Sequence, residues 1–130
     1  MLKIGFIDYY LDEWHANNYP EMFKKNSGGR YEVYCAYGKI DSPIGGMTNQ
    51  QWSEKNNIKL VNSIEEVIDT CDRLIVLSPD NPEMHPELCK LPLASGKRTY
   101  IDKTFACSRK EAEEIFDITS NLKNKSGTIF

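Results

Sequence analysis

The chain has 130 residues, the size of a single domain whose core needs no disulfide bonds. It carries 16 Lys and Arg against 19 Asp and Glu, a net charge of −3, and 40% of its residues are hydrophobic. This composition excludes a disordered, collagen-like or coiled-coil protein. The slight acidic excess also argues against nucleic acid or an anionic lipid surface as a partner.

The sequence gives no sign of a membrane span or a metal site. No apolar run approaches the roughly 20 residues that cross a bilayer, and the apolar start reaches Asp8 before it could form a signal peptide. The cysteines form no CxxC pair and have no histidine at zinc-finger spacing; they are Cys35, Cys71, Cys89 and Cys107. We therefore expect a cytoplasmic protein with reduced thiols and no bound metal.

Short apolar and β-branched runs alternate with helical segments along the chain. Strands are predicted at residues 2–7, 31–37, 72–77 and 98–101, with a weaker one at 58–61. The run Leu74-Ile75-Val76-Leu77 is continuously apolar, as in parallel sheets that are covered on both faces.

Capping boxes mark the starts of several helices. Ser63 and Ser108 are each followed three residues later by a glutamate, and Thr48 begins a weaker third box. The helix after Ser108 is expected to have one apolar face, made of Ala112, Ile115, Phe116, Thr119 and Leu122. The helix after Asp12 contains Pro20, which predicts a kink near residue 16 or a restart at the proline.

These elements predict a Rossmann-like, three-layer α/β/α domain with a doubly wound parallel sheet. Its ligand crevice should lie at the carboxyl ends of the strands, formed by residues 8–12, 37–41, 78–85 and 102–105. The glycine-containing loop at residues 38–47 is expected to be mobile. Trp52 and Tyr34 are interpreted as core or helix-packing residues rather than stacking platforms.

The stretch at residues 77–119 resembles the N-terminal dinucleotide-binding domain of the glucose-fructose oxidoreductase / inositol dehydrogenase (Gfo/Idh/MocA) family. The positions at the family's spacing are His85, Gly96, Lys97, Asp102 and Lys103. Gly5-Phe6-Ile7 and Tyr19-Pro20-Glu21-Met22 are similar to the family's first strand and first helix, so the resemblance covers nearly the whole chain.

The resemblance implies that Lys103 is catalytic, beside the nicotinamide ribose and the substrate hydroxyl. A lysine at a strand end can polarise an alcohol oxygen or relay its proton, and the alternative is a solvated lysine. Asp102 stands where the family has Glu, and Thr104 where it has Pro.

The resemblance also implies a cofactor-facing loop containing Ser78, Pro79 and Asn81. We give His85 two interpretations: it lies in the cofactor crevice, or it caps the helix that it begins.

The expected phosphate-binding turn departs from the dinucleotide pattern. The positions that should hold glycine are occupied by Asp8, Tyr10 and Glu13. A carboxylate there would repel a pyrophosphate by about 1 to several kcal/mol at about 4 Å. The rings of Tyr9, Tyr10 and Trp14 would fill the space that glycines leave open.

The expected ribose contact is also displaced. Asp41 could bind the adenosine ribose of NAD, while Lys39 or Arg30 could favour the 2′-phosphate of NADP, so the choice of cofactor stays open.

Three hypotheses of function follow. In the first, residues 1–130 are the nucleotide-binding part of an NAD(P)-dependent oxidoreductase acting on a sugar or polyol hydroxyl, without the C-terminal substrate domain and inactive alone. In the second, the domain binds a small metabolite near Asp8, Asp12 and His85. In the third, it is an assembly module or homo-oligomer whose sheet edge pairs with another chain.

Overall fold

The structure is a computed structural model that describes residues 1–120 and 128–129. Its centre is a five-stranded, entirely parallel sheet in the order β3-β2-β1-β4-β5. The strands are β1 (Leu2–Asp8), β2 (Tyr31–Gly38), β3 (Lys59–Leu60), β4 (Arg73–Val76) and β5 (Thr99–Ile101). Each strand falls within about two residues of its predicted range.

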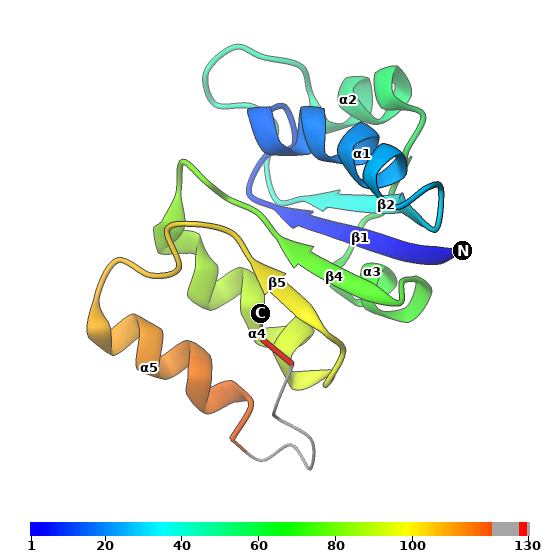
Figure 1. Ribbon diagram of the computed structural model, residues 1–130. Helices are drawn as coiled ribbons and strands as arrows, with labels where there is room; N and C mark the ends of the chain where they lie inside the picture. The colour runs from blue at the N-terminus through cyan, green and yellow to red at the C-terminus, as the bar shows by residue number, and fades with distance from the viewer. Residues whose placement is uncertain (121–127, 130) are drawn as a thin grey trace.

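Helices cover both faces of this sheet. Figure 1 shows α1 (Trp14–Asn26) and α2 (Asn49–Asn56) on one face, and α3 (Ile64–Thr70), α4 (His85–Ala94) and α5 (Arg109–Ile118) on the other. A short 3-10 turn, η1 (Pro82–Met84), precedes α4. This arrangement confirms the predicted Rossmann-like, three-layer α/β/α fold.

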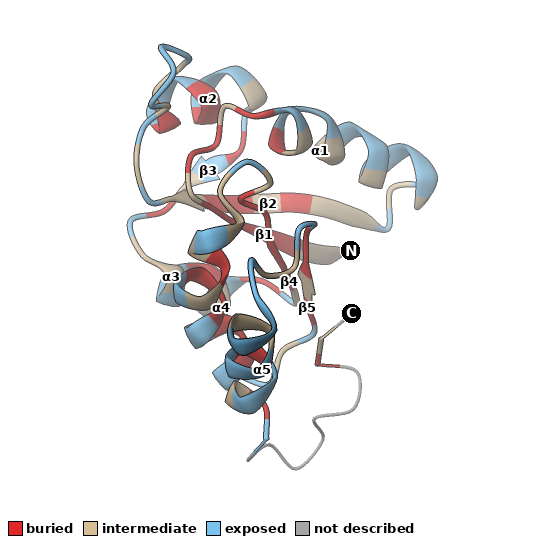
Figure 2. Ribbon diagram, turned by 90° about the vertical axis from the view of Figure 1, so that its left-hand side faces the viewer, coloured by how far each residue is buried: buried red, intermediate tan, exposed pale blue. Residues whose placement is uncertain are grey.

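The side chains on the two faces of β1 belong to two separate hydrophobic cores, because successive side chains of a strand point to opposite faces. Ile4 and Phe6 pack beneath α1 and α2 with Trp52, whereas Ile7 packs beneath α3 and α4 with Val67. Figure 2 shows the result: the central strands are largely buried and the outer sides of the helices are exposed. The prediction that Trp52 is a core residue is confirmed, since its side chain is fully buried.

Gly5 sets the distance between β1 and α3. A Cβ at Gly5 would lie 2.2 Å from Cγ1 of Val67 and 3.0 Å from Sγ of Cys71. No real Cβ atom approaches another atom so closely, so α3 lies against the strand only because position 5 has no side chain.

The predicted helix starts are found, with differences in detail. Thr48 makes a full capping box with Gln51. Ser63 and Ser108 cap their helices through the hydroxyl, and the Glu111 carboxylate accepts from the N–H of Cys107. The hydroxyls satisfy backbone donors that would otherwise have no partner.

Two expectations about helices are corrected. Helix α1 does not restart at Pro20: it is continuous from Trp14 to Asn26, with the proline inside it. On α5, Ile115 is buried as expected, but Phe116 is exposed and stacks on Phe105, with ring centroids 5.2 Å apart. Leu122 of the predicted face lies outside the described residues.

Residues 128 and 129 lie beside β5. Ile129 forms a parallel bridge with Thr99, and the Thr99 N–H donates to the Thr128 carbonyl at 2.7 Å, while residues 127 and 130 lie outside the described part.

The four cysteines are free thiols: Cys35, Cys71 and Cys89 are buried, and Cys107 is exposed. Within the described residues, no helix has both the length and the apolar composition that crossing a bilayer requires.

Candidate functional site

The candidate site is the carboxyl edge of the sheet, where β1 and β4 lie side by side and their chains leave in opposite directions. The loop after β4 is bonded directly to the end of β1, because the Ser78 N–H donates to Oδ1 of Asp8 at 2.9 Å. The loop after β5 follows Asp102, whose N–H donates to the Val76 carbonyl at 2.9 Å. Most of the predicted site residues therefore gather at one edge of the sheet.

Asp8 ends β1 and is 1% exposed. Its Oδ1 accepts from the backbone N–H groups of Tyr9 and Ser78, at 2.8 and 2.9 Å. Its Oδ2 is buried with no donor in the described part of the chain, and the Glu13 carboxylate is its neighbour. Burial, followed by the charge of Glu13, raises the pKa of Asp8 well above its usual range. The environment thus favours an uncharged carboxyl that can donate its proton to Glu13.

Glu13 caps the amino terminus of α1 with its own side chain. Oε1 accepts from the Ala16 N–H at 2.8 Å and Oε2 from the His15 N–H at 2.6 Å. These donors belong to the first turn of the helix, where free N–H groups and the helix dipole favour an anion. The positive end of α1 is therefore already neutralised from within the chain.

His15 joins α1 to the end of β5. Its Nδ1 lies 3.0 Å from Oε2 of Glu13, and its Nε2 lies 3.4 Å from Oδ2 of Asp102. Asp102 is 2% exposed, and its Oδ1 accepts from the Tyr100 hydroxyl at 3.4 Å. One imidazole therefore connects two buried carboxylates from different elements.

Tyrosines surround this group of acids. Burial, with Asp102 as the next contribution, raises the pKa of Tyr19 to about 12. Burial raises the pKa of Tyr10 to about 12 as well, and its hydroxyl donates to Oδ2 of Asp80 at 3.2 Å. These hydroxyls stay protonated near neutral pH, so here they serve as donors to carboxylates.

The β1–α1 turn does not fit a dinucleotide pyrophosphate in the usual position. Two of the α1 amides that would bind it are occupied by Glu13, and Tyr10 and Leu11 fill the turn with buried side chains. The predicted repulsion by Asp8 is a smaller effect than the sequence suggested, because Asp8 points into the protein and is driven toward its neutral form. Glu13 was predicted only as a residue at a glycine position. In the structure its carboxylate accepts from two of the backbone N–H groups that a phosphate would use.

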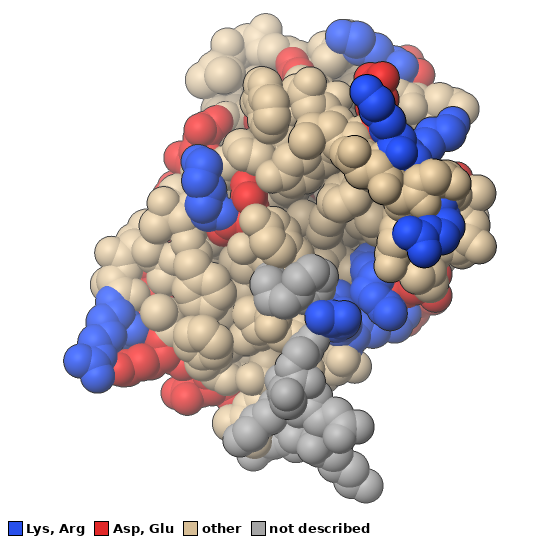
Figure 3. All heavy atoms as spheres, in the orientation of Figure 1, with Lys and Arg blue, Asp and Glu red and all other residues tan. Residues whose placement is uncertain are grey.

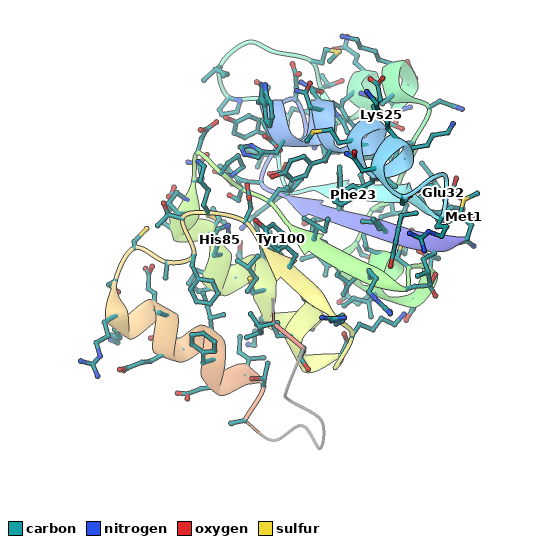
Figure 4. The ribbon with its side chains drawn as sticks, viewed as in Figure 1. Met1, Phe23, Lys25, Glu32, His85 and Tyr100 are labelled. Atoms are coloured by element: carbon teal, nitrogen blue, oxygen red, sulfur yellow. The ribbon has the colours of Figure 1, made fainter. Side chains whose placement is uncertain are left out.

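His85 lies at the start of α4 with its ring completely buried (Figure 4). Nε2 is 2.5 Å from the Leu77 carbonyl oxygen and Nδ1 is 2.9 Å from that of Phe105. The ring makes no capping bond to its helix. In this structure His85 ties the loop after β5 to the end of β4, and it thereby positions the Asp102–Lys103 segment.

Lys103 follows the buried Asp102 and is itself exposed, with a cis peptide bond to Thr104. The structure thus places a lysine ammonium at the carboxyl edge, next to the end of β5. It shows no contact that would assign a catalytic role, which stays a proposal.

The loop after β4 is fixed mainly by its own hydrogen bonds. Ser78 is buried with a φ of 54°, and its hydroxyl donates to the Asn81 carbonyl at 2.8 Å. The Asn81 side chain donates to Glu83, and Pro79 is partly exposed between them. This loop borders the crevice as expected, and its cofactor role stays a prediction.

Asp41 lies near the carboxyl ends of β2 and β3. A hollow of about 510 Å³ there is lined by Asp41, Lys39, Asn49 and Gln50, among others. Lys39 pairs with Glu87 at 2.5 Å, and Asp41 accepts from the Asn49 N–H at 2.8 Å. Arg30 immediately precedes β2 at the opposite edge of the sheet, which separates it from this hollow.

Asn49 is the polar centre of this region. Its Oδ1 accepts from the Leu11 N–H at 3.0 Å, and its Nδ2 donates to the carbonyls of Gly38 and Ile40, at 3.2 and 2.8 Å. Met47 N–H donates to Oδ2 of Asp12 at 2.8 Å, so the loop at 38–47 is bonded at both ends. Its predicted mobility stays a prediction.

A larger groove of about 610 Å³ lies between α1 and the β4–β5 side of the sheet, and Tyr19 and Tyr100, which neighbour Asp102, are among its lining residues. Its wall is mostly apolar and aromatic, with Phe23, Ile75 and Tyr100 among the lining residues, and Arg30, Arg73 and Arg98 also line it. Figure 3 shows the middle of this side of the molecule largely without charged side chains. Among the predicted site residues, Arg30, proposed for a 2′-phosphate, lines this groove, whereas Asp8, Asp41, His85 and Lys103 do not.

Sequence reasoning missed His15 and the capping role of Glu13. Glutamate is an uncommon N-cap compared with Ser, Thr, Asp or Asn, so position 13 gave no capping signal. The cue that could have found both is the proximity of an acid and a histidine, Glu13 and His15, at the start of the first helix.

No protein family model matches the chain. An uncharacterized oxidoreductase of Schizosaccharomyces pombe is 27% identical over 114 residues, which is 87% of this chain and 29% of that protein. The relative is thus an oxidoreductase by name, at an identity that does not establish family membership.

Solved dehydrogenase structures share the fold. The dehydrogenase MviM of Clostridium difficile superposes with a TM-score of 0.67 at 24% identity, over 91% of this chain and 35% of that one. The dehydrogenase WlbA of Chromobacterium violaceum, solved with NADH and UDP-GlcNAcA, gives 0.68 at 15% identity, over 90% and 31%. The chain therefore has the fold of dinucleotide-binding dehydrogenase domains and spans about a third of the length of these proteins.

Proposed function

We propose that residues 1–130 form the nucleotide-binding-type part of an oxidoreductase related to the Gfo/Idh/MocA family, acting on a sugar or polyol hydroxyl with NAD or NADP. The observation that carries this proposal is Lys103, an exposed lysine that directly follows the buried Asp102 at the carboxyl edge of a dehydrogenase-type sheet. The named relative and the dehydrogenase structures support the reaction class.

In this proposal Lys103 acts on the substrate oxygen. An ammonium at the end of β5 can donate a hydrogen bond to a hydroxyl oxygen or hold the proton that leaves it. His85 fixes the loop that carries Lys103, through the Phe105 carbonyl. The remaining substrate contacts would come from outside these residues, so we expect no turnover by residues 1–130 alone.

NAD or NADP would supply the hydride chemistry when bound. Because Glu13 occupies the amides of α1, the pyrophosphate would have to lie away from that helix. The hollow beside Asp41 is the nearest place for an adenosine ribose. The β1–α1 turn itself does not fit the cofactor in its usual position.

The occupied turn favours a second candidate function. A domain that has kept the sheet and the crevice but neutralises its own helix terminus could hold a small metabolite without a phosphate. Such a binding or assembly module would have no redox activity.

Calorimetric titration separates the two candidates. Purified residues 1–130 would be titrated with NADH and NADPH, and in parallel with a mixture of sugars and polyols. Saturable binding of either dinucleotide supports the oxidoreductase, and sugar binding without dinucleotide binding supports the module. If titration with NADH or NADPH up to about millimolar concentration gives no heat of binding, the cofactor is removed from the proposal for these residues.

The proposed role of Lys103 is tested in the complete natural protein. We predict that Lys103→Ala lowers the rate of substrate oxidation by about 100-fold or more, as expected for loss of a general acid–base group. Lys110→Ala, which removes an exposed lysine on α5, is the matched control and should leave the rate unchanged. An equal rate for Lys103→Ala and the wild type removes Lys103 from the mechanism.

A further inference from the structure

We infer that Glu13 is a specificity-determining residue: its carboxylate is a built-in anion that excludes phosphate-bearing ligands from the amino terminus of α1, and His15 holds it there. This inference deepens the proposed function, because it states which ligands the crevice rejects and which residue rejects them. It concerns the same site and rests on its geometry rather than on the redox chemistry.

The first step is that Glu13 uses the donors a phosphate would use. Oε1 and Oε2 accept from the N–H groups of Ala16 and His15 at 2.8 and 2.6 Å. Free amides at a helix start, with the helix dipole behind them, are what makes such a terminus bind anions. Since Glu13 already takes two of these amides, an incoming phosphate would have to displace a covalently tethered carboxylate.

The second step is that Glu13 is held against displacement. The Glu13 side chain is 3% exposed, and its Oε2 also lies 3.0 Å from Nδ1 of His15. The other ring nitrogen of His15 is 3.4 Å from Oδ2 of the buried Asp102. To leave its position, Glu13 would have to break two backbone hydrogen bonds and its contact with an imidazole anchored on β5.

The third step is that Asp8 is not the excluding group. Its Oδ1 accepts from the backbone N–H groups of Tyr9 and Ser78, which lie outside α1, and the side chain is almost completely buried. Its buried Oδ2 has Glu13 as its neighbour, so a proton on Asp8 would be donated to Glu13. Asp8 thus adds a further anchor to Glu13 and presents little charge to a ligand.

The consequence is a crevice that selects by charge. The groups nearest the start of α1 are the almost completely buried Glu13 and Asp102 carboxylates, with His15 between them. A ligand group that approaches there without displacing Glu13 is a hydroxyl, an amide or a cation, and a phosphate is rejected.

Inorganic pyrophosphate is the probe that tests this inference, with NADH in a second arm. The variants are Glu13→Ala and Glu13→Gln, with Asp8→Asn and the exposed Glu21→Ala on α1 as matched controls. Binding would be followed by calorimetry and by backbone amide shifts of residues 15 and 16, and folding by circular dichroism.

We expect no saturable pyrophosphate binding by the wild type, Asp8→Asn or Glu21→Ala. Glu13→Ala should bind at least about tenfold more tightly than the wild type, with the largest shifts at residues 15 and 16. Glu13→Gln keeps a capping oxygen without its charge, so it should gain less in the same direction. If Glu13→Ala does not fold, Glu13→Gln decides the question.

Three results would overturn the inference. The first is pyrophosphate binding at residues 15 and 16 of the wild type, the second is no gain in a folded Glu13 variant, and the third is an equal gain in Asp8→Asn. The variant His15→Asn tests separately whether His15 holds Glu13 in place. Tighter pyrophosphate binding by this variant, with Glu13 still present, supports that role of His15. The same lack of pyrophosphate binding as in the wild type overturns it.

The NADH arm separates this inference from the proposed function. If the wild type binds NADH and Glu13→Ala does not change the affinity, the oxidoreductase proposal stands and the inference fails. If the wild type binds no NADH but Glu13→Ala gains pyrophosphate binding, the inference stands and the cofactor assignment fails.

Discussion

At the scale of single residues, the unusual feature is a set of carboxyl groups inside the protein at the end of a parallel sheet. Asp8 and Asp102 are each almost completely buried, and each has one oxygen without a hydrogen-bond donor in the described part of the chain. Burying a charge without a donor is costly, so a carboxyl in such a place gains a proton or finds a cationic neighbour. Burial and the charge of Glu13 raise the pKa of Asp8 and so favour the first outcome there, while Oδ2 of Asp102 lies 3.4 Å from Nε2 of His15.

The raised pKa of Asp8 predicts a specific pH dependence of stability. Above its usual value of 3.8 the unfolded chain loses the proton while the folded protein retains it, so the free energy of unfolding falls as the pH rises toward the folded-state pKa. Asp8→Asn keeps an oxygen for the two backbone donors and offers an N–H to Glu13. We predict that this variant is more stable than the wild type at pH 7.5, by about 1 kcal/mol or more, and that the advantage shrinks at pH 4.

Urea unfolding at the two pH values measures this difference. Glu114→Gln removes an exposed carboxylate from α5 and should show no comparable pH-dependent gain. A constant difference between Asp8→Asn and the wild type across this range would mean that Asp8 is charged in the folded protein.

At the scale of elements, strands and helix starts were predictable because their signals are local. The apolar runs gave all five strands, and the hydroxyls of Thr48, Ser63 and Ser108 marked three helix starts. The sequence left a kink or a restart of the helix at Pro20 open, and it could not decide between them because the outcome depends on tertiary packing rather than on propensity. The exposure of Phe116 was missed because its ring stacks on Phe105 of the loop before α5, a contact that depends on side-chain geometry.

The contact between β1 and α3 yields a prediction at this scale. Gly5→Ala places a Cβ 2.2 Å from Cγ1 of Val67, so we expect a loss of about 1–3 kcal/mol, typical of overpacking. Val67→Ala creates a cavity by itself, but in the double variant it provides room for the new methyl group. The double variant should therefore be more stable than the sum of the single changes predicts, by at least about 0.5 kcal/mol.

Chemical denaturation of the four proteins gives this coupling energy. If the losses of stability of the two single variants add exactly in the double variant, α3 moves away freely, and Gly5 does not set the distance between α3 and the sheet.

At the scale of the whole molecule, the fold was predictable from the sequence, whereas the chemistry of the site was predictable only in part. The alternation of strands and capped helices predicted the parallel sheet, and the crevice followed from the rule for doubly wound sheets. The capping of α1 by Glu13 did not follow, because its hydrogen bonds to the amides, and the 3.4 Å approach of His15 to Asp102, depend on side-chain geometry. The resemblance around Lys103 predicts a reaction centre at the end of β5, and that role stays a prediction.

The groove between α1 and β5 affects how this protein can be assayed. Its apolar, aromatic wall beside arginines is suited to anilinonaphthalene sulfonate and related dyes, which combine aromatic rings with an anionic group. The native protein should therefore be fluorescent with such dyes before any unfolding, a signal usually taken as evidence of a molten globule. Intrinsic fluorescence avoids this confusion, because Trp52 is fully buried and Trp14 is 61% exposed, so the change on melting reports mainly on the core beneath α2.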